Sequence, residues 1–168
     1  MALPEGNVPF LGVNFLIMEL QIKEILAKET YELRHPFLRK GQPIESCQLE
    51  KDEDTDTIHL GAYYAYSLVG ILSAIYNECS EHKTRRAVQL RAMAVHPDFR
   101  RKKIASQLIQ AILSKLKEKQ SVEIVWLNAR VIANDLYLNN GFSPVGLPFE
   151  IEPIGTHQRF IKWINHES

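Results

Sequence analysis

The sequence predicts an α/β fold of the α+β class, in which helices flank a central sheet. Two observations carry this prediction. Residues 89–116 read as a buried strand, a tight basic turn and an amphipathic helix, and a further apolar strand follows at residues 122–128. Strand, helix and strand in this order make a right-handed crossover between parallel strands, and ligands gather at the carboxyl ends of such strands.

The N-terminal part of the chain predicts a strand and a helix. Residues 1–13 contain several prolines and glycines and read as a loose lead-in. Residues 15–22 are apolar and predict the first strand, with a helix as the alternative for so short a run. Residues 25–33 predict a helix, which Pro36 breaks or kinks because proline lacks a backbone N–H.

Three strands are predicted in the middle of the chain. Residues 58–64 and 68–76 predict an antiparallel hairpin, and residues 87–95 predict its third partner. The polar interval at residues 77–86 predicts a loop. Simple alternation assigns one face of the third strand to Gln89, Arg91, Met93 and Val95.

A helix with a core-facing stripe follows the basic turn. Its apolar residues recur every four positions, at Ile104, Leu108, Ile112 and Leu116. Residues 131–139 predict a short helix, which Gly141 ends in a left-handed conformation. Residues 142–150 and 157–164 predict an antiparallel pair that closes the sheet.

The composition bounds the class of protein. The chain has 168 residues, and we assign residues 1–168 to a single domain. Its 20 basic residues balance 20 acidic ones, so no overall field favours nucleic acid or a membrane as a partner. The two cysteines suggest no disulfide framework, which fits a cytoplasmic protein. The apolar run at residues 8–20 is too short for a membrane span and lacks the basic flank of a signal peptide.

No metal site and no cysteine nucleophile are predicted. The acidic run at residues 50–56 lacks the central glycine and the distal glutamate of a calcium-binding loop, so we interpret it as a solvated turn. Cys47 and Cys79 do not have metal-ligand spacing, and no histidine is paired with Cys47.

The basic turn before the helix predicts an anion site. Four cations stand where the helix dipole is already positive, namely Arg100, Arg101, Lys102 and Lys103. They repel the dipole and one another unless an anion is bound. The alternative is that the side chains swing into solvent while Asp98 caps the helix.

This segment resembles the signature of the GNAT superfamily of N-acetyltransferases. Members show a V-x-P-x-[YF]-R turn and then Arg/Gln-x-x-Gly-x-Gly/Ala at the start of a helix. Here the second motif is formed by Arg100-Arg101-Lys102-Lys103-Ile104-Ala105. Lys103 replaces the glycine that lets backbone amides approach the coenzyme A pyrophosphate.

A second landmark of the same superfamily follows in the right order. The segment from Asn128-Ala129-Arg130 through Ala133 to Phe142 resembles the pattern N-x-x-A-x-x-[FL]-Y-x-x-x-G-F. Two N-terminal phrases, YELRHPFLRKGQPIESC and DTIHLGAY, also look like a bacterial subgroup of the superfamily. The resemblance implies a mixed, mostly antiparallel sheet of about six or seven strands that is splayed at the cofactor site, with helices on both faces.

The resemblance also implies an activity. Family members transfer an acetyl group from acetyl-CoA directly to an amine, which here would belong to a small molecule or a peptide. Relatives are often dimers, so a homodimer is an expected assembly. Tyr137 matches the family's tyrosine, which protonates the departing thiolate as general acid. The alternative for Tyr137 is packing under Phe142.

The cofactor-binding roles follow the same resemblance. Backbone N–H groups of Met93 and Val95 would polarise the thioester carbonyl, and Asn134 would contact the pantetheine arm. The basic turn would bind the pyrophosphate. The full expected set is Met93, Ala94, Val95, Arg100, Arg101, Lys102, Lys103, Ile104, Ala105, Ser106, Asn128 and Asn134.

The general base and the acceptor stay open. Candidates for the base are Glu78, Glu123, His96 and His157, and ordered water is the alternative. An anionic acceptor would find cations at Arg34, Arg39, Arg91 and Arg130. The default for these arginines is ordinary ion pairing with Glu32, Glu45 and Glu123.

Two other functions compete with acetyl transfer. Lys103 in place of glycine raises a non-catalytic, acyl-CoA-binding regulatory module as the alternative. Nucleic-acid binding through residues 100–103 would require an extended basic face with stacking aromatics, which the neutral chain lacks.

Overall fold

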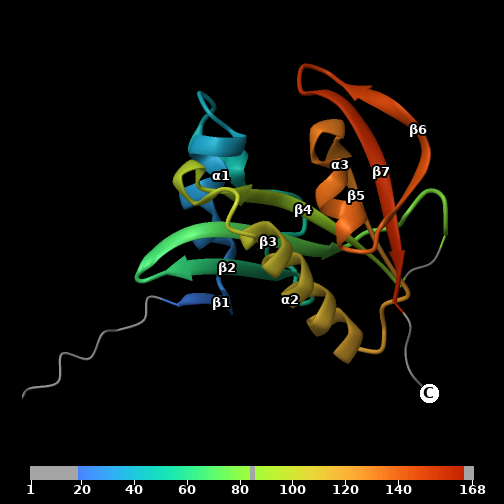
Figure 1. Cartoon of the computed structure of the whole chain (residues 1–168), viewed down its shortest axis with the longest axis horizontal. Helices are drawn as coiled ribbons and strands as arrows, with labels where there is room; N and C mark the ends of the chain where they lie inside the picture. Colours follow the sequence, from blue (N-terminus) through green and yellow to red (C-terminus); the bar gives the residue numbers. More distant parts are fainter. Residues whose placement is uncertain (1–18, 84–85, 165–168) are drawn as a thin grey trace, which may run out of the picture.

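The computed structural model describes residues 19–83 and 86–164 and contains a seven-stranded sheet in the order β1-β2-β3-β4-β5-β7-β6 (Figure 1). Its strands are β1 Leu20–Glu24, β2 Ile58–Tyr64, β3 Ser67–Tyr76, β4 Ala87–Val95, β5 Ile124–Arg130, β6 Ser143–Ile151 and β7 Gly155–Trp163. Neighbours are antiparallel except β4 and β5, which are parallel. The mixed, mostly antiparallel sheet is therefore confirmed.

Helices cover both faces of this sheet. The helical segments are η1 Ala27–Thr30, α1 Tyr31–Leu38, η2 Ile44–Cys47, η3 Pro97–Phe99, α2 Ile104–Glu118, η4 Val131–Ala133 and α3 Asn134–Asn139. On one face α1 packs over β3 and β4, where Leu33 meets Ile71 and Ala94. On the other face α2 and α3 bury the main core, to which α2 contributes its predicted stripe of Ile104, Leu108, Ile112 and Leu116.

The N-terminal elements differ from the prediction. The first half of the predicted strand at residues 15–22 lies outside the described residues, and the described strand is Leu20–Glu24. The predicted helix at residues 25–33 begins later, as the short η1 followed by α1, and it continues past Pro36. Burial of Leu33 and Arg34 against the sheet holds this helix, so tertiary packing outweighs the hydrogen bond that proline removes.

Strand β4 contains a β-bulge at Ala92, whose φ is 52°. The register with β3 shifts between Ile71 and Ser73, which pair with Ala94 and Arg91. An extra residue reverses the side-chain alternation. The side chains that face the core under α2 are therefore Val88 and Leu90 before the bulge, which are even-numbered, and Met93 and Val95 after it, which are odd-numbered. The expectation that Gln89 and Arg91 share a face with Met93 and Val95 was wrong.

Strands β4 and β5 separate soon after they begin, as Figure 1 shows. Their ladder contains three residue pairs, from Ala87↔Ile124 to Gln89↔Trp126. On the other side of β4, His96 N donates to Val69 O at 2.9 Å. Backbone N–H groups of successive residues in an antiparallel ladder point alternately toward the two neighbouring strands. Since the N–H of His96 points toward β3, those of Val95 and Met93 point the other way, where β5 no longer pairs with β4.

The C-terminal elements agree with the prediction. Strands β6 and β7 form an antiparallel pair, and β7 joins the sheet beside β5. Gly141 ends α3 with a φ of 81°, the left-handed conformation that its sequence context predicts. Within the described residues, no helix has the length and apolar character that a membrane crossing would require.

Candidate functional site

The opening between β4 and β5 lies at the carboxyl ends of two parallel strands. Helix α2 begins shortly after β4, at Ile104, and α3 begins shortly after β5, at Asn134. Both helices pack on the same face of the sheet, so their N-terminal ends follow the two strand ends that border the opening (Figure 1). This is the arrangement in which α/β sheets bind ligands.

The turn before α2 leaves its first amides free of intrahelical partners. Gln107 N donates to Lys103 O at 3.0 Å, and no side chain of a described residue caps the helix. The preceding amides of Ile104, Ala105 and Ser106 therefore point toward an external acceptor. Asp98 does not cap this helix, which corrects the alternative reading of the turn.

The four cations of this turn are exposed, and none of the described carboxylates pairs with them. Arg100, Arg101, Lys102 and Lys103 make no ion pair with any described residue. Lys102 Nζ lies 5.0 Å from the centre of the Phe99 ring. The structure thus keeps several positive charges at the positive end of a helix dipole, where an anion would offset them.

Two residues of the turn have a left-handed backbone, with a φ of 61° at Arg101 and 60° at Lys103. This conformation costs a non-glycine residue about 1–2 kcal/mol. It also explains why the family motif has glycine where this chain has Lys103. The lysine is accommodated in the same backbone conformation.

Replacing Lys103 with glycine should therefore raise the free energy of unfolding slightly, by up to about 1 kcal/mol. Relief of the left-handed strain outweighs the larger chain entropy that glycine gives the unfolded state. Urea unfolding of Lys103→Gly against Lys102→Gly checks this, because Lys102 is not left-handed and should gain nothing. Equal effects of both changes would contradict the argument.

Tyr137 lies buried in α3 with 8% of its surface exposed. Its ring makes an edge contact with Phe142 at 6.0 Å and a tilted contact with Phe160 at 5.8 Å. Burial raises the pKa of Tyr137 to about 12. Because this pKa lies far above 7, the hydroxyl is protonated at neutral pH and has a proton to donate. The hydroxyl makes no hydrogen bond to a described residue. The packing role and the acid role are compatible.

Asn134 and Asn140 have different surroundings although both belong to the α3 region. Asn134 Oδ1 is buried and has no hydrogen-bond partner among the described residues. Asn140 Nδ2 donates to Ser106 Oγ at 3.1 Å and Asn140 Oδ1 accepts from Gln110 at 2.8 Å. Asn140 therefore fixes α3 to α2, and Asn134 is left with an acceptor that a ligand N–H would satisfy.

The structure separates Asn128 from the rest of the expected cofactor set. Neighbouring Leu127 and Ala129 belong to the core under α2, so Asn128 faces the other side of the sheet. There its Oδ1 accepts from Arg159 Nε at 3.0 Å. Arg159 is itself held by Glu81, at 2.7 Å. The side chain of Asn128 is thus committed to a structural contact.

The base candidates divide into two groups. Glu123 is bound to Arg86 at 2.7 Å at the start of β5, and Glu78 follows the end of β3, beside the start of β4, so neither lies by the opening. His96 directly follows β4, and His157 lies opposite Arg130 at the end of β5. His157 Nδ1 is 2.7 Å from Gly155 O, and His96 Nδ1 accepts weakly from Asp98 N at 3.3 Å.

Arg34 is a structural residue, because its guanidinium is 1% exposed and bound to Asp52. The two side chains make contacts of 2.5 and 3.1 Å, and Arg34 also donates to Ser73 Oγ at 2.8 Å. His59 joins this network through Ser73 Oγ at 2.7 Å and the carbonyl of Asp52 at 2.9 Å. The expected pairing of Arg34 with a glutamate was wrong. The predicted solvated turn agrees with the exposure of residues 53–56 but not with Asp52, which is buried.

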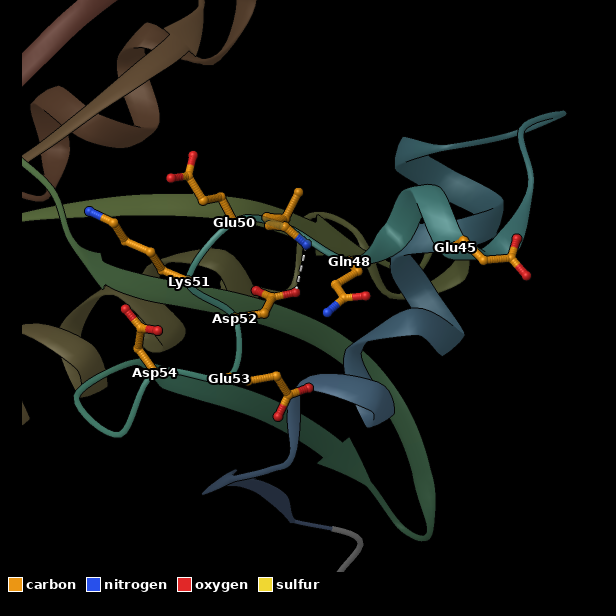
Figure 2. Close-up of a pocket in the computed structure, with 8 residues that line it drawn as sticks. Glu45, Gln48, Glu50, Lys51, Asp52, Glu53 and Asp54 are labelled. Carbon is orange, nitrogen blue, oxygen red and sulfur yellow. Dashed lines mark hydrogen bonds between the residues drawn. The ribbon is translucent and has the colours of Figure 1, made fainter.

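The loop around Asp52 borders an open hollow of about 370 Å³ beside η2 (Figure 2). Its lining includes Glu45, Glu50, Glu53 and Asp54, and also Asp52, whose carboxylate is bound to Arg34. Among the described residues, no group of histidine, cysteine and acidic side chains has the arrangement of a metal site. Sequence reasoning missed Asp52, although polar His59 and Ser73 inside apolar strands were a usable signal.

Comparison with known proteins identifies the family of this chain. The model of the acetyltransferase (GNAT) family matches residues 21–142. YitI of Bacillus subtilis strain 168, an uncharacterized N-acetyltransferase, is 36% identical over 138 residues, which cover 82% of this chain and 92% of YitI.

Solved structures show the same fold at low sequence identity. Ard1 from Thermoplasma volcanium has a TM-score of 0.69 and 20% identity, with 87% of this chain and 98% of that chain covered. NAA60 of Arabidopsis thaliana, solved in complex with acetyl-CoA, has a TM-score of 0.66 and 16% identity, with 87% and 99% covered.

Proposed function

The chain belongs to the acetyltransferase (GNAT) family, and we propose that it transfers an acetyl group from acetyl-CoA directly to an amine in a ternary complex. The observation that carries this proposal is the opening between β4 and β5, with the uncapped end of α2 and the buried face of α3 beside it. The solved complex of NAA60 with acetyl-CoA, which shares the fold, supports acetyl-CoA as the donor.

The residues at the opening fit coenzyme A. The first-turn amides of α2 and the cations of residues 100–103 suit the pyrophosphate. The unpartnered Oδ1 of Asn134 suits an amide N–H of the pantetheine arm. We retain Met93, Ala94 and Val95 as contacts through their backbone, and we drop the side chain of Asn128 from the set because Arg159 occupies it.

Acetyl-CoA would supply the acetyl thioester. The N–H groups of Met93 and Val95 would stabilise the negative charge that develops on the carbonyl oxygen. The amine nitrogen forms a bond to the acetyl carbon as the carbon–sulfur bond breaks, and Tyr137 gives its proton to the departing sulfur. The acceptor ammonium would first lose a proton to ordered water or to His96 or His157, because only the neutral amine has a lone pair that can attack. The second proton that the nitrogen loses as the amide forms would return through water to Tyr137.

Calorimetric titration with acetyl-CoA tests the binding half of the proposal. We expect one site per chain, and we expect Arg100→Gln/Lys102→Gln to raise Kd about tenfold or more because two phosphate contacts are lost. The matched control is Lys117→Gln/Lys119→Gln, which removes the same charge from the other end of α2 and should change Kd little.

The outcomes separate the two candidate functions. Absence of binding, or equal weakening by both double variants, would contradict the assigned pyrophosphate site. Tight binding without transfer to any amine in a broad screen would favour the non-catalytic acyl-CoA-binding module over the enzyme.

A further inference from the structure

Arg91 is a partly buried arginine at the edge of the opening. No hydrogen bond or ion pair joins its guanidinium to another residue in the described ranges 19–83 and 86–164. Arginine is seldom buried unless an anionic partner is present, since desolvation of an unpaired charge is costly. The position therefore calls for an anion that no residue in these described ranges supplies.

The register places Arg91 at the end of a polar row across the sheet. His59 of β2 lies opposite Ser73 of β3, and Ser73 lies opposite Arg91 of β4. Directly opposed residues share a face, and Ser73 Oγ accepts from Arg34 of α1, so Arg91 also faces α1. The contacts of Arg34 and Asp52 satisfy His59 and Ser73, but they do not reach Arg91.

A second cation adds to the unbalanced charge. Arg39, at the end of α1, donates to the carbonyls of Ser46 and Leu38, and none of the described carboxylates pairs with it. Burial and then repulsion by Arg39 lower the pKa of Arg91, while Asp52 and Glu50 act in the opposite direction. Asp52 is bound to Arg34, so Arg39 and Arg91 have no anion in contact among the residues that the structure describes.

Arg91 lies close along β4 to the backbone that is proposed to contact the thioester. Arg91 precedes Met93 by two residues, a span of at most about 7 Å along a strand. Gln89 shares the face of Arg91, and its Oε1 is bound by Asn77 at 2.9 Å. Its Nε2 makes no hydrogen bond to a described acceptor, so it is a further donor beside Arg91.

We propose that the acetyl acceptor is a small amine with a carboxylate or phosphate a few bonds from its nitrogen, and that Arg91 and Arg39 bind this anionic group. This inference rests on the proposed acetyl transfer. It narrows the acceptor class to molecules such as amino acids or phosphorylated amines, whose anionic end would be held on the α1 side while the amine reaches the opening.

A titration that does not depend on catalysis tests the anion site. Protein labelled with ¹⁵N-arginine would be titrated with inorganic phosphate and, separately, with acetate, and the Nε–H signals followed by NMR. We expect saturable shifts of the Arg91 signal with at least one anion, and the signal of buried Arg34 should stay in place. The absence of a saturable Arg91 shift with both anions would overturn the proposal.

Matched acceptor pairs test the substrate class. With acetyl-CoA as donor, kcat/KM would be compared for amino acids and their amides, and for O-phosphoethanolamine and ethanolamine. The preference for the anionic member should fall about 10- to 100-fold in Arg91→Gln, because a charge-assisted hydrogen bond is lost. Because the same two acceptors are compared in the wild-type protein and in Arg91→Gln, the different basicities of their amines cancel. If the preference falls for the amino acid and its amide, the bound group is a carboxylate; if it falls for O-phosphoethanolamine and ethanolamine, it is a phosphate.

Two further variants test whether the preference for the anionic acceptor depends on the guanidinium of Arg91. Arg91→Lys keeps the charge but loses the planar fork, so it should recover part of the preference. Arg86→Gln, which removes an arginine bound to Glu123 at the start of β5, should leave the preference unchanged. An unchanged preference in Arg91→Gln would overturn the proposal. If no acceptor is acetylated, the transfer proposal fails, and the NMR titration alone decides whether the anion site exists.

Discussion

Replacing Tyr137 with phenylalanine should lower kcat by about 100-fold or more. General acid catalysis contributes about 10²–10⁴-fold, and no other tyrosine occupies the family's position. Steady-state rates of coenzyme A release measure the effect. The ring contacts with Phe142 and Phe160 are retained, so the variant should fold and bind acetyl-CoA as before. Tyr76→Phe is the matched control, because the Tyr76 hydroxyl contacts Ser121 at 3.2 Å away from the opening.

The same variant has a second readout in stability at high pH. The pKa of Tyr137 is about 12 when folded and near 10 when unfolded, so the folded state holds the proton more tightly. This contribution to stability is complete below pH 10 and is lost as the pH rises toward 12. Tyr137→Phe should abolish this pH-dependent loss of stability, which unfolding measured at pH 9 and at pH 11 would detect.

The kcat measurement decides the acid role. Unchanged kcat across pH in Tyr137→Phe would reject it.

Replacing Asp52 with asparagine should lower the free energy of unfolding by about 3–5 kcal/mol. The change leaves the buried guanidinium of Arg34 without its counter-charge, and removing one partner of a buried pair costs about that much. Urea unfolding monitored by circular dichroism measures the loss. Glu53→Gln is the matched control, since Glu53 is an exposed neighbour on the same loop and should change stability little.

A double replacement separates the pair from its surroundings. Arg34→Met/Asp52→Leu removes both charges together, so it should recover a large part of the stability lost by Asp52→Asn. A loss below about 1 kcal/mol in Asp52→Asn would show that water reaches Arg34 and that the pair contributes as little as a surface ion pair.

Most helices and strands could be predicted from the sequence because the residue patterns that indicate them are local. The stripe of α2, the strands β2 to β5 and the left-handed stop at Gly141 follow from periodicity and turn chemistry. The left-handed backbone at Lys103 also agrees with the motif, which has glycine there. These features depend on neighbours within a few residues, so a single sequence is enough to find them.

The remaining features depend on contacts between distant segments. The bulge at Ala92 occurs at a residue that rarely adopts a positive φ, and it is set by pairing with β3 rather than by its own sequence. It moves Arg91 to the α1 face, which alternation could not foresee. The pairing of Arg34 with Asp52 spans 18 residues and two loops, and ordinary surface pairing was the better expectation from sequence alone.

Because β4 and β5 share three residue pairs, the sheet consists of two half-sheets joined by a short ladder and by helix α2. Amide hydrogens beyond the ladder should exchange with solvent faster than those within each half. An acetyl-CoA molecule bound across the opening would protect them and slow the relative motion of the halves. Occupancy would then be visible as hydrogen-exchange protection and as a ligand-dependent melting temperature, even before any acceptor is identified.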